Sequence, residues 1–121
     1  MVSFDEIRSL ALSLPRTEEH LIRGRLKYRI KQIVYLAASA DETTIGLGFP
    51  REERAAIVAA RPDVFFLPRP SDLRYRWICA RLDPLESDEA HELVLDAWQM
   101  CVPKRVAAAY LASLPSSNIG L

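Results

Sequence analysis

The feature that most constrains this chain is a stretch in which every second side chain is basic. The basic positions are Arg23, Arg25, Lys27, Arg29 and Lys31. Because successive side chains of a β-strand point to opposite faces of a sheet, this alternation predicts a strand with its cations on one face, about 6.6 Å apart. Leu26, Tyr28 and Ile30 then lie on the other face, which we expect to be covered by the core.

The residues after the basic stretch favour further strands. The apolar run Ile33–Ala38 is separated from the stretch by one residue, which predicts a hairpin that turns near Lys31–Gln32. Asp41–Glu42 is the next turn, and residues 43–49 are predicted to form a third strand. Strands that follow one another through such short turns make an antiparallel meander.

The remainder of the chain mixes short strands with helices. Residues 64–67 and 75–82 are predicted to be strands, whereas we interpret residues 16–20 as a polar connection and residues 68–72 as a loop. Apolar side chains recur at helical spacing in residues 4–14, 50–61, 87–101 and 103–114. This order predicts an α+β fold in which helices cover an antiparallel sheet.

The chain length predicts one domain over residues 1–115, with a flexible tail over residues 116–121. Its 16 Lys and Arg balance its 16 Asp and Glu, which argues against a protein that coats DNA through its overall charge. The charges are nevertheless separated, because residues 23–31 contain only cations and residues 83–96 contain six acids and no Lys or Arg. We therefore expect one basic and one acidic surface.

The chain ends and cysteines predict a cytoplasmic protein that does not contact a membrane. Residues 1–6 are acidic and lack the long apolar run of a signal peptide, and no apolar segment has the length of a membrane span. Cys79 and Cys101 lie among apolar residues without motif spacing, so we expect free buried thiols of a reducing compartment.

No group of residues predicts catalysis, a metal or a cofactor. His20 and His91 are the only histidines, and neither cysteine lies at ligand spacing from them. No base is visible that would activate a Ser or Cys nucleophile. Gly46 and Gly48 lack the third glycine of a phosphate loop, so we expect them to allow a bulge or close packing. The sequence thus predicts a protein that is not an enzyme.

Several short motifs recur along the chain in a fixed order. They are Leu14-Pro15 followed by Thr17–His20, then Gly24, Tyr28, Ile33–Tyr35, Arg61–Phe65, Arg76–Ile78, Asp96–Trp98 and Val102–Arg105. In this order and spacing they resemble the MmcQ/YjbR-like family over about residues 3–112. The resemblance implies a two-layer sandwich similar to that of frataxin, also described as a double-wing arrangement. It also implies DNA binding, since the family is described generically as DNA-binding.

The basic stretch and the resemblance together predict weak, largely non-specific DNA binding through phosphate contacts. The residues of this predicted interface are Arg23, Arg25, Lys27, Arg29, Lys31, Arg74, Arg76, Trp77, Lys104 and Arg105. Trp77 and Tyr75 are the aromatic side chains available to stack on bases, although a Trp in an alternating strand is more often a core residue.

The basic stretch has two other interpretations. Its cations can pair with carboxylates on neighbouring strands, where each exposed pair contributes little to stability. Alternatively, the protein is an interaction module whose basic surface binds an acidic protein partner or the acidic helix of another copy. The sequence does not predict an oligomeric state.

Overall fold

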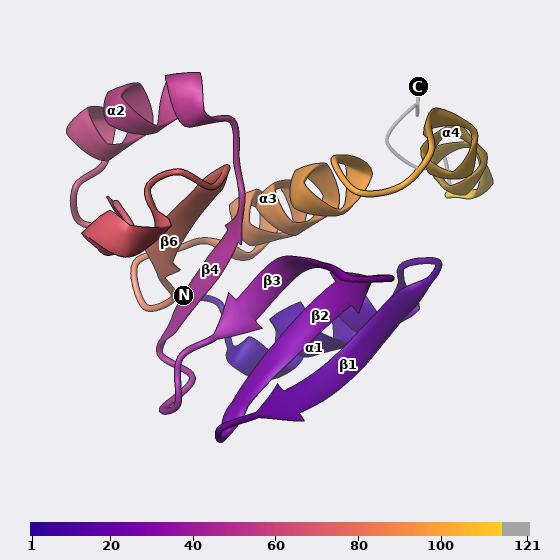
Figure 1. Ribbon diagram of the computed structural model, residues 1–121, viewed down its shortest axis with the longest axis horizontal. Helices are drawn as coiled ribbons and strands as arrows, with labels where there is room; N and C mark the ends of the chain where they lie inside the picture. The colour runs from indigo at the N-terminus through magenta and orange to yellow at the C-terminus, as the bar shows by residue number, and fades with distance from the viewer. Residues whose placement is uncertain (115–121) are drawn as a thin grey trace.

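The computed structural model describes residues 1–114, which form one antiparallel sheet with helices around it (Figure 1). The strands are β1 (Thr17–Ile22), β2 (Arg25–Ile30), β3 (Ile33–Ala38), β4 (Thr44–Gly48), β5 (Phe65–Phe66) and β6 (Trp77–Arg81), in the spatial order β1-β2-β3-β4-β6-β5. The helices are α1 (Phe4–Ser13), α2 (Arg51–Ala60), α3 (Ser87–Gln99), α4 (Lys104–Ser113) and the short 3-10 helix η1 (Pro70–Asp72). The predicted α+β class with an antiparallel sheet is confirmed. The tail predicted at residues 116–121 lies outside the described residues.

The basic stretch is one strand between two turns, and not a continuous strand as predicted. Arg23 and Gly24 have positive φ angles of 53° and 76°, the backbone of a tight two-residue hairpin turn. Lys31, with a φ of 55°, turns the chain into β3. Residues 16–20 were wrongly interpreted as a connection, because strand β1 begins at Thr17 and pairs with β2 along its whole length. The strand-borne cations are Arg25, Lys27 and Arg29.

The core lies between one face of the sheet and the helices α1 and α3. Tyr28 and Ile30 are buried on the face of β2 opposite the cations, as predicted. Helix α3 packs on β3 and β4, whereas α1 packs on β1 and on α3. Trp98 of α3 is fully buried, as expected, and its indole N–H donates to the Pro15 carbonyl at 2.9 Å. None of the described helices has the length and apolar character needed to cross a membrane.

A half-buried carboxylate, that of Glu19, attaches α1 to the first hairpin. The Arg8 guanidinium of α1 donates to both carboxylate oxygens of Glu19 in β1, at 2.7 and 3.0 Å. The hydroxyl of the buried Tyr28 donates to the same carboxylate at 2.7 Å. Arg8 first, and then Tyr28, lower the pKa of Glu19. Burial, followed by the bond to Glu19, raises the pKa of Tyr28. Glu19 thus stays ionised and ties a helix to two strands.

The last strand is shorter than the sequence predicts. Residues 75–82 were predicted to be extended, whereas β6 begins at Trp77, and the predicted loop at residues 68–72 contains the helix η1. Within β6, Ile78 is fully buried whereas Trp77 is only half-buried. The place of Trp77 in an alternating strand suggested a core residue. The structure instead places Trp77 on the face of the sheet that points away from the core.

Candidate functional site

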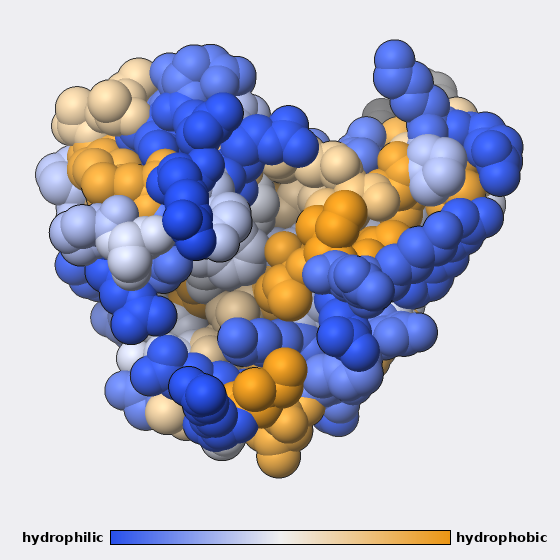
Figure 2. All heavy atoms as spheres, in the orientation of Figure 1, coloured by the Kyte–Doolittle hydropathy of each residue, from blue (hydrophilic) through white to orange (hydrophobic). Residues whose placement is uncertain are grey.

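The face of the sheet opposite α1 and α3 is hollowed. Figure 2 shows the depression between the part of the molecule that carries α2 and the part that carries α4, with apolar atoms at its floor and polar atoms along its rim. It consists of two adjoining cavities of about 790 and 290 Å³. Both cavities are lined by Arg25, Ala37, Ala38, Arg69, Asp72 and Trp77. We call this combined depression the sheet hollow.

Cations dominate the charge of the sheet hollow. Its basic lining residues are Arg25 and Lys27 from β2, and Arg69 and Arg76 from the segment before β6. The one acidic residue in the two linings is Asp72, which accepts from Arg69 Nε at 3.1 Å. Within residues 1–114, the other cations of the hollow form no ion pair. Four positive side chains against one negative leave a local charge of +3 (4 − 1) in a molecule whose net charge is zero.

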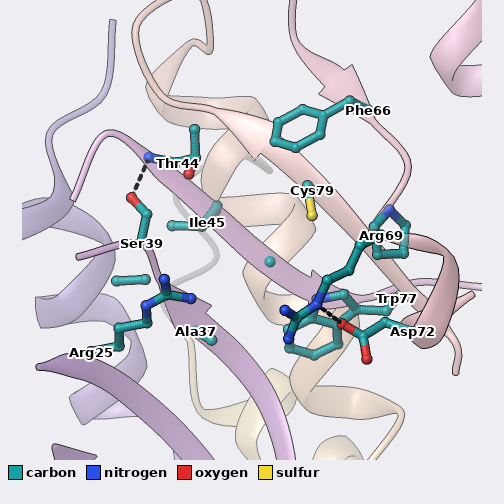
Figure 3. A pocket seen from close by; sticks show the side chains of 13 residues that line it. Arg25, Ala37, Ser39, Thr44, Ile45, Phe66, Arg69, Asp72, Trp77 and Cys79 are labelled. Atoms are coloured by element: carbon teal, nitrogen blue, oxygen red, sulfur yellow. Dashed lines mark hydrogen bonds and ion pairs between the residues drawn. The ribbon is translucent and has the colours of Figure 1, made fainter. Parts of the chain in front are cut away.

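Trp77 forms part of the wall of both cavities (Figure 3). Its indole packs over Gly46 of the neighbouring strand β4. A Cβ added to Gly46 would lie 2.8 Å from Trp77 Cε2 and 2.9 Å from Cζ2, closer than van der Waals contact permits. Gly46 therefore allows the ring to lie against the sheet, which confirms the close packing predicted for this glycine.

Helix α2 holds the segment that leads into Trp77. The Arg54 guanidinium donates to the backbone carbonyls of Leu73, Tyr75 and Trp77, at 2.9, 3.1 and 3.2 Å. Arg51, one turn earlier, donates to the carbonyl of Arg74 at 3.0 Å. A planar guanidinium with several donors suits such a cluster of carbonyls. Hydrogen bonds from α2 thus fix the backbone of residues 73–77, which carries the aromatic and basic side chains of this rim.

Tyr75 and Arg74 form a small unit of their own on this rim. The guanidinium carbon of Arg74 lies 4.9 Å from the Tyr75 ring centroid, and its Nη2 donates to the Tyr75 hydroxyl at 2.8 Å. Tyr75 lines the larger cavity and is exposed. The charge of Arg74 is therefore directed at the ring and its hydroxyl, and Arg74 is absent from both linings.

The two cysteines also border the sheet hollow, Cys79 in the smaller cavity and Cys101 in the larger. Both are free, as predicted, but half-buried. Burial raises the pKa of each thiol. A neutral thiol is a poor nucleophile and a poor metal ligand, so the hollow does not activate these cysteines. Among the described residues, no group of His, Cys, Asp and Glu is placed to hold a metal ion.

The structure brings together four of the residues predicted from the sequence, namely Arg25, Lys27, Arg76 and Trp77. The predicted residues outside the linings are Arg23 and Lys31 in turns, Arg29 in β2, Arg74 beside Tyr75, and Lys104 and Arg105 in the first turn of α4.

In the part of the chain described, Arg29 is the one residue of the basic stretch that pairs with a carboxylate. Its Nε lies 3.8 Å from Glu18 Oε1 on β1, directly across the strand pair. The same Nε is buried and makes no hydrogen bond. This ion pair is of the kind expected if the cations of the basic stretch pair with carboxylates on neighbouring strands. Arg29 also lines neither cavity, so it is not among the cations of the sheet hollow.

Arg69 and Asp72 are site residues that sequence reasoning missed. Arg69 directly precedes η1 and Asp72 is its last residue, and their local sequence contains only turn signals. Figure 3 shows Arg25 reaching into the cavity from one side and Arg69 from the other, with Trp77 beside the Arg69–Asp72 pair. The pairing of β4 with β6 adds the segment that holds these residues to the same sheet as Arg25, with β3 and β4 between β6 and β2.

Comparison with known proteins assigns the chain to a protein family. The family model YjbR matches residues 12–100, well over half of the sequence. The chain belongs to the YjbR family. The resemblance seen in the sequence is thereby confirmed.

A solved structure supports the YjbR assignment at the level of the fold. The crystal structure of the Deinococcus radiodurans protein DR2400, which carries the domain DUF419, superposes with a TM-score of 0.73. The alignment covers 99% of this chain and 94% of the other at 19% sequence identity. No curated protein matches the sequence. At this identity the likeness shows a shared fold.

Proposed function

We propose that this protein binds DNA weakly and largely without sequence preference, by holding phosphate groups in the sheet hollow. The observation that carries the proposal is the cluster of Arg25, Lys27, Arg69 and Arg76 around a cavity with a single carboxylate. Cations that converge on a concave surface raise the local concentration of an anionic chain. The DNA binding that the family resemblance implies agrees with this charge pattern.

The weakness and lack of specificity follow from the kind of contact. Phosphate contacts position a nucleic acid without distinguishing its bases. The hollow offers three cations without an ion pair in the described part of the chain, and a fourth that must exchange Asp72 for a phosphate. A protein with so few contacts binds in the range of non-specific complexes. The proposal includes no catalytic step.

The proposal is tested by fluorescence anisotropy with labelled single-stranded and duplex DNA at several salt concentrations. Three to four phosphate contacts predict an affinity that falls about 20- to 150-fold between about 50 and 200 mM salt. The double variant Arg25→Glu with Arg76→Glu should abolish binding, because it reverses charge on both sides of the hollow.

A matched control changes the net charge by the same amount at another place. Lys104→Glu with Arg105→Glu reverses two exposed cations of α4 that line neither cavity. This pair should weaken binding only slightly, through the overall field. Equal losses for both pairs would show that the hollow is not the binding surface, and absence of binding at low salt would refute DNA binding altogether.

A second candidate is an interaction module, favoured by the charge distribution on α3. Asp88, Glu92 and Asp96 recur every four residues on one side of the helix, all exposed, and none forms an ion pair within residues 1–114. These three acids are complementary in charge to the sheet hollow of another copy. The sheet hollow would likewise bind an acidic protein partner. Size-exclusion chromatography at low and high salt tests this candidate, since self-association of opposite charges must disappear as salt rises.

A further inference from the structure

We infer that the sheet hollow is built for a single strand, with one unpaired base stacked on Trp77. The inference rests on the proposed function, because it specifies which form of nucleic acid the same surface takes. It is carried by three observations: the size of the hollow, the placement of the Trp77 ring, and the distribution of cations on either side of that ring.

The size of the hollow fits a nucleotide and not a duplex. Its larger cavity measures about 790 Å³, within the range of pockets that enclose small molecules. In a duplex the bases are paired and stacked inside, so a duplex can present only its backbone to such a cavity. A single strand can turn a base into it.

The Trp77 ring is preorganised for stacking, because its neighbours already hold it in place. Gly46 supports the ring from the side of the sheet, and the Trp77 carbonyl is held by Arg54. The ring is half-buried, forms part of the wall of both cavities, and is absent from the hydrophobic core. A ring that is already immobilised loses little conformational freedom when a base stacks on it, which favours binding.

The cations lie on both sides of this ring. Arg25 and Lys27 extend from β2, whereas Arg69 and Arg76 come from the segment before β6. Strands β3 and β4 separate β2 from β6, so the two groups start about 14 Å apart at the backbone. A strand that crosses the hollow between them can contact cations on each side of the base held by Trp77.

The test compares single-stranded oligothymidylate with a mixed-sequence duplex of the same length, using the full chain at low salt. Stacking on an aromatic residue predicts that the single strand binds about 5- to 150-fold more tightly than the duplex. Trp77→Leu should remove this preference and leave the salt dependence unchanged, because the cations remain. Trp77→Phe should retain most of the preference, since phenylalanine also stacks.

Intrinsic fluorescence of the unmodified protein gives a second readout that needs no folded variant at position 77. Trp98 is fully buried, so a base can reach only Trp77 of the two tryptophans. The single strand should quench the emission, and the duplex should not.

Two negative results are distinguishable. Equal affinities for both DNA forms, without quenching, would overturn the stacking inference and leave the electrostatic proposal standing. Absence of binding to either form would overturn the proposed function and this inference together.

Discussion

Gly46 and Trp77 are complementary: the indole of Trp77 occupies the space where any other residue at position 46 would place its Cβ. The two residues lie on adjacent strands, β4 and β6, on the face of the sheet that the helices α1 and α3 leave open. Because the ring forms part of the wall of both cavities of the sheet hollow, a glycine far from it in sequence helps to determine the shape of the candidate site.

Gly46→Ala is expected to displace the Trp77 ring and to destabilise the fold by about 1–3 kcal/mol, the usual cost of overpacking. Urea unfolding measures the stability, and a shift of the tryptophan emission measures the displacement. Gly48→Ala is the matched control, because a Cβ there meets Ala97 Cβ and Met100 Sδ at 3.7 Å, an ordinary contact. Equal destabilisation by both substitutions would contradict the proposed role of Gly46.

Tyr28→Phe is expected to cost about 1–2 kcal/mol of unfolding free energy. The substitution removes a buried hydroxyl that donates to the ionised Glu19, and hydrogen bonds to charged groups are among the stronger ones. Tyr75→Phe, at an exposed position, should change the stability by less than about 0.5 kcal/mol. Chemical denaturation of the three proteins side by side provides the comparison, and similar values for both variants would refute the prediction.

Glu19 should make the stability depend on pH. Its pKa is lowered in the folded state by Arg8 and then by Tyr28, so the folded protein binds a proton at Glu19 less readily than the unfolded chain does. The stabilisation is therefore present above the unfolded pKa of about 4.3 and is lost as the pH falls through the folded value. Thermal unfolding between pH 3 and pH 7 should show a difference between the native protein and Glu19→Gln that is largest at neutral pH.

The control for this pH series is Glu52→Gln, an exposed position in the first turn of α2. It should change the stability by less than about 0.5 kcal/mol throughout the range. A Glu19→Gln difference that stays constant from pH 7 to pH 3 would mean that the Arg8–Glu19 contact does not stabilise the ionised form.

Arg54→Ala is expected to loosen the segment from Leu73 to Trp77 and to lower the stability by about 1–3 kcal/mol, because three backbone carbonyls lose their donors. Hydrogen exchange should accelerate within that segment and leave the β1–β2 hairpin unchanged. Arg54→Lys should not restore protection, since one ammonium cannot span three carbonyls.

Arg51→Ala removes a single bond, to the Arg74 carbonyl, and serves as the comparison. Its effect on exchange should be clearly smaller than that of Arg54→Ala. If the two variants behave alike, the three-carbonyl contact is not what holds the rim of the sheet hollow.

The parts of the fold that could be predicted from the sequence are those encoded in local spacing. The alternation in β2 predicted which side chains face the core, and the helical spacing around Trp98 predicted the buried face of α3. Strand β1 escaped prediction because its polar segment Thr17–His20 lacks the alternation of apolar and polar residues. As an edge strand it buries little, so its sequence shows no apolar period.

The candidate site was only partly predictable, for a different reason. The sequence singled out Arg25, Lys27, Arg76 and Trp77, but it also suggested cations that turned out to lie in turns, in an ion pair or on α4. It gave no sign of Arg69, whose neighbours are ordinary loop residues. Whether a side chain can contact a ligand depends on the residues around it, and in a folded protein those residues come from distant parts of the chain.

The sequence by itself determined the four helices, most of the strands, the α+β class, the family and the presence of a basic strand, because each of these depends on periodicity and motifs within short segments. Only the tertiary structure decided that Trp77 faces away from the core and that Arg69 stands opposite Arg25. The physical reason is that α1 and α3 cover one face of the sheet and leave the other open. The antiparallel pairing of β4 with β6 then places Trp77 over Gly46 on that open face.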